Sequence, residues 1–170
     1  MTKPSKYYGK YRGTVVSNAD PEQRGRIQAS VPDVFSGPLS SWALPCVPIA
    51  GNQNGIFVVP QNGARVWIEF EHGDVNFPIW TGGFWNPGEV PPLALAGSQV
   101  SPSIVLQTAL QNAIVISDMA GPVGGIMLTA RSGAAILIND AGISIANGKG
   151  ATINMHGATI DFNLGALTVP

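Results

Sequence analysis

The side chains most able to do chemistry in this 170-residue sequence are the carboxylates near one histidine. Glu69, Glu71 and Asp74 lie close to His72 in sequence, with Asp33 further upstream. Carboxylates beside an imidazole can serve general acid–base catalysis. Glu69 and Glu71, two residues apart, would share the outward face of a strand, which fits a solvated or subunit-facing edge. With no Ser/His/Asp order and no phosphate-binding glycine motif, we expect no catalytic residue and no enzyme.

Metal binding is the second chemistry to consider. The single cysteine, Cys46, lies in an apolar stretch between two prolines, so we expect a small buried hydrophobic residue rather than a reactive thiol. His156 could meet its copies around the axis of an oligomer and hold a metal there. If Ile153 and Met155 face inward, however, His156 faces outward. We therefore expect neither a metal nor any other cofactor.

Nucleic-acid binding is the third chemistry, because aromatic and basic side chains together can bind single strands. The first half supplies such side chains: Tyr7, Tyr8, Tyr11 and Trp67, with Lys3, Lys6, Lys10, Arg12, Arg24, Arg26 and Arg65. Seven acidic residues in the same half balance these charges, and the whole chain has a net charge of −1. We expect no nucleic-acid partner, and single-strand binding is the alternative function.

The composition divides the chain into two parts. Charged residues make up only 11% of the sequence, against about 25% in typical proteins, so much of the surface can face other chains. Residues 90–170 carry only Arg131, Lys149, Asp118, Asp140 and Asp161 as charged side chains. The composition changes at the proline-rich residues 86–92, which is where we expect the two parts to be joined. We expect a first domain at 1–89, a linker at 90–112 and a second domain at 113–170.

The first domain has the pattern of a small closed β-barrel. Short candidate strands are residues 9–16, 25–31, 42–49, 64–71 and 77–82, separated by turn residues. Pro45 and Pro48 make the third an edge or an irregular strand. In the fourth, Val66, Ile68 and Phe70 alternate with Arg65, Trp67, Glu69 and Glu71, and this period of two indicates one buried face. The expected core consists of Val15, Ile27, Val66, Ile68, Phe70 and Ile79.

The second domain contains apolar pairs spaced by two residues. Heptads have a different spacing, and the interspersed glycines would each cost a helix about 1 kcal/mol, so a coiled coil is excluded. A ribbon of such short strands cannot bury its apolar side chains alone. We expect several copies, most simply three, to wind around one axis and to pair their edges with one another. The expected axis residues are Ile136, Ile138, Ile143, Ile145, Ile153, Met155, Ile160, Phe162, Leu167 and Val169.

Several motifs resemble one family. Residues 60–82, PQNGARVWIEFEHGDVNFPIWTG, resemble the OB-fold signature of phage baseplate spike proteins, which is shared with Vgr-type spikes of type VI secretion. Residues 9–16 and 25–32 resemble the opening strands of that domain. The ending at residues 160–169, IDFNLGALTV, is similar to that of the baseplate assembly protein V group. Some spikes of this type end in a His-x-His iron motif, but here Asn154 stands at the partner position of His156.

The resemblance implies an all-β protein with an N-terminal OB-fold barrel and a C-terminal intertwined triple-stranded β-helix, a β-prism formed by a homotrimer. It implies a structural spike of a contractile injection system that attaches to a separate hub protein, contacts the target membrane transiently and pierces the cell envelope on sheath contraction. By analogy, a separate tip protein could sit at the C-terminal end. The N-terminus lacks the apolar core of a secretory signal, so we expect synthesis in the cytoplasm and a final place in a virion or extracellular particle.

Overall fold

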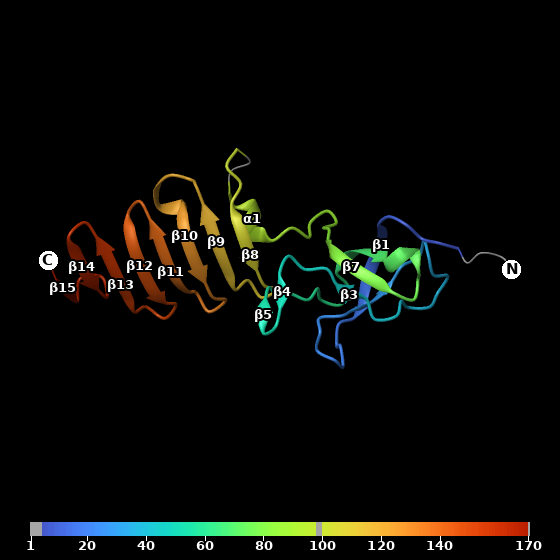
Figure 1. Ribbon diagram of the computed structural model, residues 1–170. Helices are drawn as coiled ribbons and strands as arrows, with labels where there is room; N and C mark the ends of the chain where they lie inside the picture. Colours follow the sequence, from blue (N-terminus) through green and yellow to red (C-terminus); the bar gives the residue numbers. More distant parts are fainter. Residues whose placement is uncertain (1–4, 98–99, 170) are drawn as a thin grey trace. The chain divides into compact units, whose positions relative to one another are not determined.

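The computed structural model describes residues 5–97 and 100–169 and forms two compact units, 1–88 and 89–170. In both, β-strands joined by turns and loops are the main regular structure (Figure 1). The chain is therefore all-β, as the alternating apolar pattern predicts. Short 3-10 turns at Glu71–Gly73 and Gly121–Val123 and the four-residue helix α1, Pro92–Leu95, are the only helical elements among the described residues.

The first unit is organised around a five-stranded sheet in the order β2-β1-β6-β7-β3. Its strands are β1 (Tyr11–Ser17), β2 (Gln28–Ser30), β3 (Leu44–Pro45), β6 (Arg65–Phe70) and β7 (Pro78–Gly83). Neighbouring strands are antiparallel except β3, which runs parallel to β7 at the edge of the sheet. β3 contains a proline, which has no backbone N–H to donate to a neighbouring strand. Its position at the edge of the sheet agrees with this.

One face of this sheet forms the core of the first unit. Buried apolar side chains come from every strand region: Val15, Ile27, Ala29, Val31, Ala43, Val66, Ile68, Phe70 and Trp80. Gly13 lies on β1 where an added Cβ would stand 2.9 Å from Ile68, so the absence of a side chain lets β1 approach the core closely. A second, very small sheet is the hairpin of β4 (Ala50–Gly51) and β5 (Asn54–Gly55).

Ile79 differs from the sequence expectation. It is half-buried and belongs to the outer face of the sheet, where it lies opposite Glu69. Its neighbour Trp80 occupies the core position on β7, with Pro78 buried two residues before it. Side chains alternate along a strand, so only one of the two neighbours can face inward.

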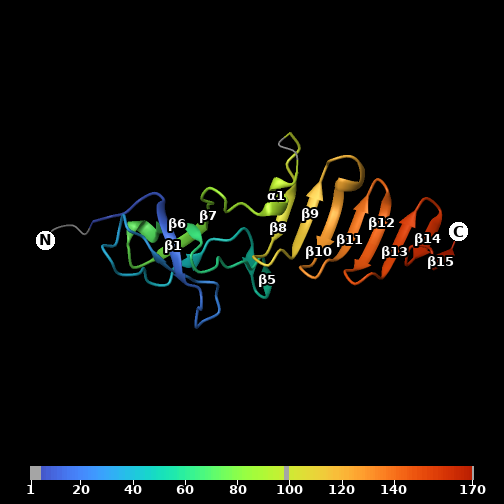
Figure 2. The same ribbon diagram turned by 180° about the vertical axis from the view of Figure 1, so that it is seen from behind.

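The second unit is one eight-stranded antiparallel sheet in which each strand pairs with the next along the chain, as Figures 1 and 2 show. The strands are β8 (Ile104–Gln107), β9 (Ala113–Ser117), β10 (Gly125–Thr129), β11 (Ala134–Asn139), β12 (Gly142–Asn147), β13 (Thr152–His156), β14 (Thr159–Phe162) and β15 (Leu167–Val169). Residues 90–112, taken above as a linker, contain α1 and also β8, which is the first strand of this sheet.

The strand pairing changes the physical account of this unit. We expected each copy to pair its edges with neighbouring copies. The meander instead satisfies the backbone of its interior strands within one chain, because short turns return each strand beside the last. Only the outer edges of β8 and β15 have no strand beside them in the described part of the chain. What the single chain leaves unsatisfied is therefore an apolar face rather than a set of backbone groups.

Candidate assembly surfaces

The apolar pairs of the second unit form two unbroken rows across the sheet. Strand register places Ile138 opposite both Ile126 and Ile143, and Ile136 opposite both Leu128 and Ile145. The same register continues through every strand pair. We call this surface the isoleucine face. It consists of Ile104, Leu106, Ile114, Ile116, Ile126, Leu128, Ile136, Ile138, Ile143, Ile145, Ile153, Met155, Ile160, Phe162 and Leu167.

The isoleucine face is open in a single chain. Its residues on β9 to β11 are each about two-fifths exposed, and Ile104 and Leu106 on the first strand are more exposed still. Complete burial of such a side chain stabilises a protein by roughly 1.5–3 kcal/mol, so about 1 kcal/mol per residue remains to be gained on covering this face. A continuous apolar surface of this extent marks an interaction site.

Nine of the ten expected axis residues lie on the isoleucine face, from Ile136 to Leu167. Val169 is opposite Ile160 by backbone register, but its side chain lies outside the described residues. The pairs on β8, β9 and β10 extend the same two rows toward the first unit in sequence. Their weaker periodicity in the sequence comes from the longer connections between these strands, not from a change of face.

The opposite face of the sheet becomes polar toward the C-terminus. The Ser144 hydroxyl donates to the Asn154 Oδ1 at 2.7 Å, and Asp161 lies opposite Asn154 on the next strand. Nearer the first strands, Val115 and Met127 share a small cavity of about 90 Å³ with Leu93 of α1. The two faces thus differ in chemistry. Only the isoleucine face is apolar from the first strand to the last.

His156 belongs to this polar side. It is exposed at the end of β13, next to Met155 of the isoleucine face, and pairs by register with Thr159. Among the described residues, no three His, Cys, Asp or Glu side chains gather as a metal site would require. No helix in the described part of the chain is long and apolar enough to cross a membrane.

Local turn chemistry sets the register of the rows. The side-chain oxygen of Asn139 accepts from the Ala141 backbone N–H at 2.9 Å, which closes the tight turn between β11 and β12. Gly142 follows with φ +133°, and a Cβ at this position would lie 2.0 Å from the Met155 carbonyl oxygen. The next strand therefore packs directly against this glycine, and a side chain here would move β12 away from β13.

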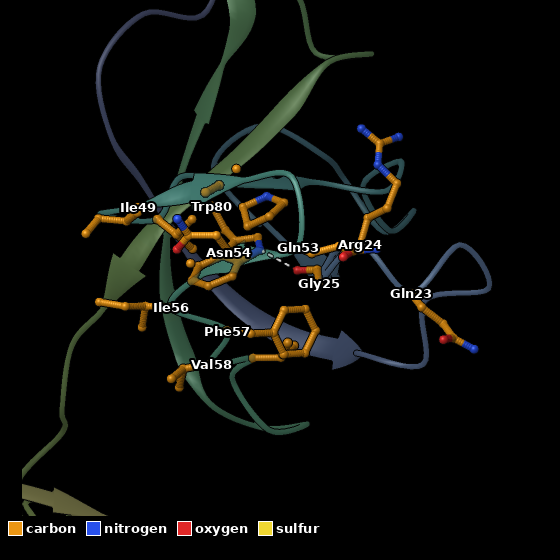
Figure 3. A pocket seen from close by; sticks show the side chains of 16 residues that line it. Gln23, Arg24, Gly25, Ile49, Gln53, Asn54, Ile56, Phe57, Val58 and Trp80 are labelled. Atoms are coloured by element: carbon orange, nitrogen blue, oxygen red, sulfur yellow. Dashed lines mark hydrogen bonds between the residues drawn. The ribbon is translucent and has the colours of Figure 1, made fainter.

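The first unit has a second exposed apolar surface around a groove. Figure 3 shows this groove between the β4–β5 hairpin and the loop at Gly25, with Trp80 beside it. Its volume is about 590 Å³, and its walls include Val47, Ile49 and Phe57. The Trp80 indole N–H donates to the Gly25 carbonyl at 3.0 Å, so a core residue fixes one wall of the groove.

The residues after β5 form the most exposed apolar segment near this groove. Ile56, Phe57 and Val58 are 50%, 72% and 70% exposed. Ile49, across the hairpin, is 56% exposed and accepts a hydrogen bond from the Ile56 backbone N–H. Sequence reasoning did not single out this segment. The run Ile-Phe-Val-Val looks like an ordinary buried strand, and only the structure shows that its first three side chains are exposed while Val59 packs against the core.

A nearly buried ion pair holds the rim of the groove. Asp20 accepts from the Arg26 side chain at 2.6 Å and from the backbone N–H groups of Glu22, Arg24 and Arg26. The Asp20 and Arg26 side chains are 3% and 11% exposed. The Arg26 guanidinium, followed by these backbone donors, holds the pKa of the Asp20 carboxyl well below its usual value of 3.8. Asp20 thus fixes the loop that carries Gly25.

The carboxylates and the cysteine considered for chemistry have ordinary surroundings. Glu69 pairs with Lys10 at 2.5 Å on the outer face of the sheet, and Asp74 accepts from the Asn76 backbone. Cys46 is exposed, which contradicts the expectation of a buried residue. Its backbone N–H bonds to the Trp80 carbonyl at the edge strand, so the backbone is held while the side chain stays outside the core.

Part of the aromatic surface considered for nucleic-acid binding is covered by the chain itself, although Tyr8 is 70% exposed. The rings of Trp67 and Phe84 contact each other at a tilt of 41°, with their centroids 4.7 Å apart. The Arg12 guanidinium covers both rings, at 5.4 Å from Trp67 and 5.0 Å from Phe84. Bases bind single-strand-binding proteins by stacking on free aromatic faces. The Arg12 guanidinium would therefore compete with a base for these rings.

Comparison with known families matches both units. Residues 11–85 match the family described as the type VI secretion system/phage-baseplate injector OB domain. Residues 103–168 match the phage baseplate V C-terminal trimerisation domain. A comparison with curated proteins finds no match. The first matched segment contains the groove and the second contains the isoleucine face.

Proposed function

The chain belongs to the phage baseplate V family of spike proteins, and from this premise we propose that it is the central spike of a contractile injection device. The family is a structural component of the phage or type VI secretion baseplate. Its C-terminal domain is a trimerisation domain, which supports a homotrimer. Beyond this, we propose how the trimer functions: it attaches to a hub below the tail tube and pierces the target envelope on sheath contraction.

The observation that carries the proposal is the isoleucine face. Three copies can direct this face toward a common axis, so that the two rows from each chain form a dry central column. Each chain offers fifteen described side chains at about 1 kcal/mol each, hence on the order of 10 kcal/mol per chain for complete burial. An obligate assembly has this kind of interface, which resembles a protein core divided between subunits.

Piercing requires stiffness along the axis. In a column of three hydrogen-bonded sheets with a packed interior, bending would separate backbone pairs and open apolar contacts together. The outer edge of β15, which has no strand beside it among the described residues, offers backbone groups on which a separate tip protein could sit. The first unit, which carries an injector OB domain, is the part that we assign to the hub.

Deletion of the gene in its own host tests this function. We expect the host to lose active particles, and a plasmid copy of the wild-type gene to restore them. A plasmid copy carrying Ile145→Asp should not restore them, while Ala146→Asp, on the opposite face of the same strand, should. Particles that infect or inject at the wild-type level without this chain would refute the proposal.

A further inference from the structure

The groove of the first unit lies beside a strand-like segment that has no partner within the chain. Residues 57–59 make no backbone hydrogen bond among the described residues, although they lie next to the β4–β5 hairpin. Residues 55–60, Gly-Ile-Phe-Val-Val-Pro, contain no charge and consist mainly of residues that favour β-structure. An exposed apolar segment with free backbone groups is a site for addition of another chain.

The size of this surface fits a protein partner. With Ile49, the exposed side chains of Ile56, Phe57 and Val58 present on the order of 400 Å² of apolar area. That is the apolar centre of an interface of about 800 Å² per partner. The charged rim residue Arg24 is paired with Glu22 at 3.1 Å. A partner therefore needs no opposite charge at this position.

We propose that this surface is covered by the first unit of a neighbouring copy of the same chain, a contact separate from the isoleucine face. The inference rests on the trimer proposed above, which ties three first units to one column. The second unit begins at Glu89, directly after the first unit ends at Gly88, so chains joined through their second units keep their first units close together. Domains held close together in this way reach effective concentrations in the millimolar range.

Charge also permits contact between copies. Residues 1–89 carry seven basic and seven acidic side chains, so neighbouring first units do not repel one another through net charge. At millimolar effective concentration, even a weak apolar contact is occupied most of the time. The neighbouring copy is thus a partner of suitable chemistry that is always within reach.

Hydrogen exchange of the purified full-length protein, with no other protein present, tests this contact. We expect the amides of residues 57–59, which have no backbone hydrogen bond within the described part of the chain, to exchange at least about tenfold more slowly than in an unstructured peptide. The double variant Phe57→Ser/Val58→Ser should lose this protection and keep the mass of three chains. Phe77→Ser is the matched control, because Phe77 is an exposed phenylalanine of the same unit that does not line the groove. It should leave the protection unchanged.

Two results would overturn the inference, and they differ in what they mean for the spike. A protein of three chains whose amides at 57–59 exchange at the peptide rate would refute the covered groove and leave the spike proposal standing. A single-chain mass, with the same amides unprotected, would refute both.

Discussion

Ile136 lies directly opposite Ile145 across the β11–β12 pair, and the two side chains are 37% and 38% exposed on the same face of the sheet. In a complete globular domain, two isoleucines paired in this way would be buried. Their exposure repeats along the rows on either side, from Ile104 to Leu167. In the second unit the strands are therefore paired within the chain, but the apolar side chains of one face remain exposed. Other copies of the chain can bury these side chains.

Replacement of Ile145 by aspartate should prevent assembly. Three copies would bring three carboxylates together in an apolar column, and an uncompensated buried charge costs about 3–5 kcal/mol. We expect the mass measured by light scattering to fall to that of one chain. Ala146→Asp, one residue along on the opposite face, should leave the mass unchanged. A stable trimer of the Ile145→Asp protein would show that this face does not form the axis.

Replacement of Gly142 by alanine should separate β12 from β13. The new Cβ would meet the Met155 carbonyl oxygen at 2.0 Å, and the backbone at φ +133° is one that only glycine adopts readily. We expect a fall in the thermal midpoint and faster amide exchange in β12 and β13. Gly157→Asn is the control, since Gly157 has φ +58° and open space around it, which asparagine tolerates. Equal midpoints for the two variants would contradict this account.

The Asp20–Arg26 pair should make the stability of the first unit depend on pH. The pKa of Asp20 is lower in the folded protein than its usual value of 3.8, so the folded state favours the ionised carboxylate. The contribution of this carboxylate to the stability of the folded protein is complete above the usual pKa. It is lost as the pH falls through the lowered pKa. Asp20→Asn should lower the thermal midpoint most at neutral pH. The difference in thermal midpoint between this variant and the wild type should become smaller below about pH 4. A gap that is constant between acidic and neutral pH would be inconsistent with the pair.

Two neighbouring residues on β7 should respond very differently to truncation. Trp80→Ala removes a core side chain and its hydrogen bond to Gly25, and we expect a loss of about 3–5 kcal/mol of unfolding free energy. Ile79→Ala removes a half-buried side chain from the outer face and should cost about 1 kcal/mol or less. Denaturant unfolding of the full-length protein measures both. Equal losses of unfolding free energy in the two variants would contradict the assignment of Trp80 to the core face and Ile79 to the outer face of β7.

The alternation of residue types along the chain predicted much of the fold. Val66, Ile68 and Phe70 alternate with Arg65, Trp67 and Glu69 on β6, and all three are buried. On β7, apolar residues occupy both positions 79 and 80, so alternation alone could not say which faced inward. In the second unit, the spacing of the pairs predicted short strands. It could not predict that the strands pair within one chain, because identical turns are compatible with either arrangement.

The groove of the first unit could not be predicted from the same pattern. Residues 56–59 are uniformly apolar, and no polar neighbour marks which side is exposed. A uniform apolar run is typical of a buried strand, and whether it is covered by its own chain or by another is decided by packing. Cys46 shows the same limit, because its apolar neighbours in sequence line the groove while its own side chain is exposed.

The mass of the wild-type protein in solution, measured by light scattering across a range of concentrations, tests the central claim most directly. We expect three times 17.7 kDa, unchanged on dilution and in mild denaturant, because each chain supplies an apolar face that only other copies cover. A well-behaved single chain of 17.7 kDa would leave the isoleucine face open to water and contradict the trimeric spike.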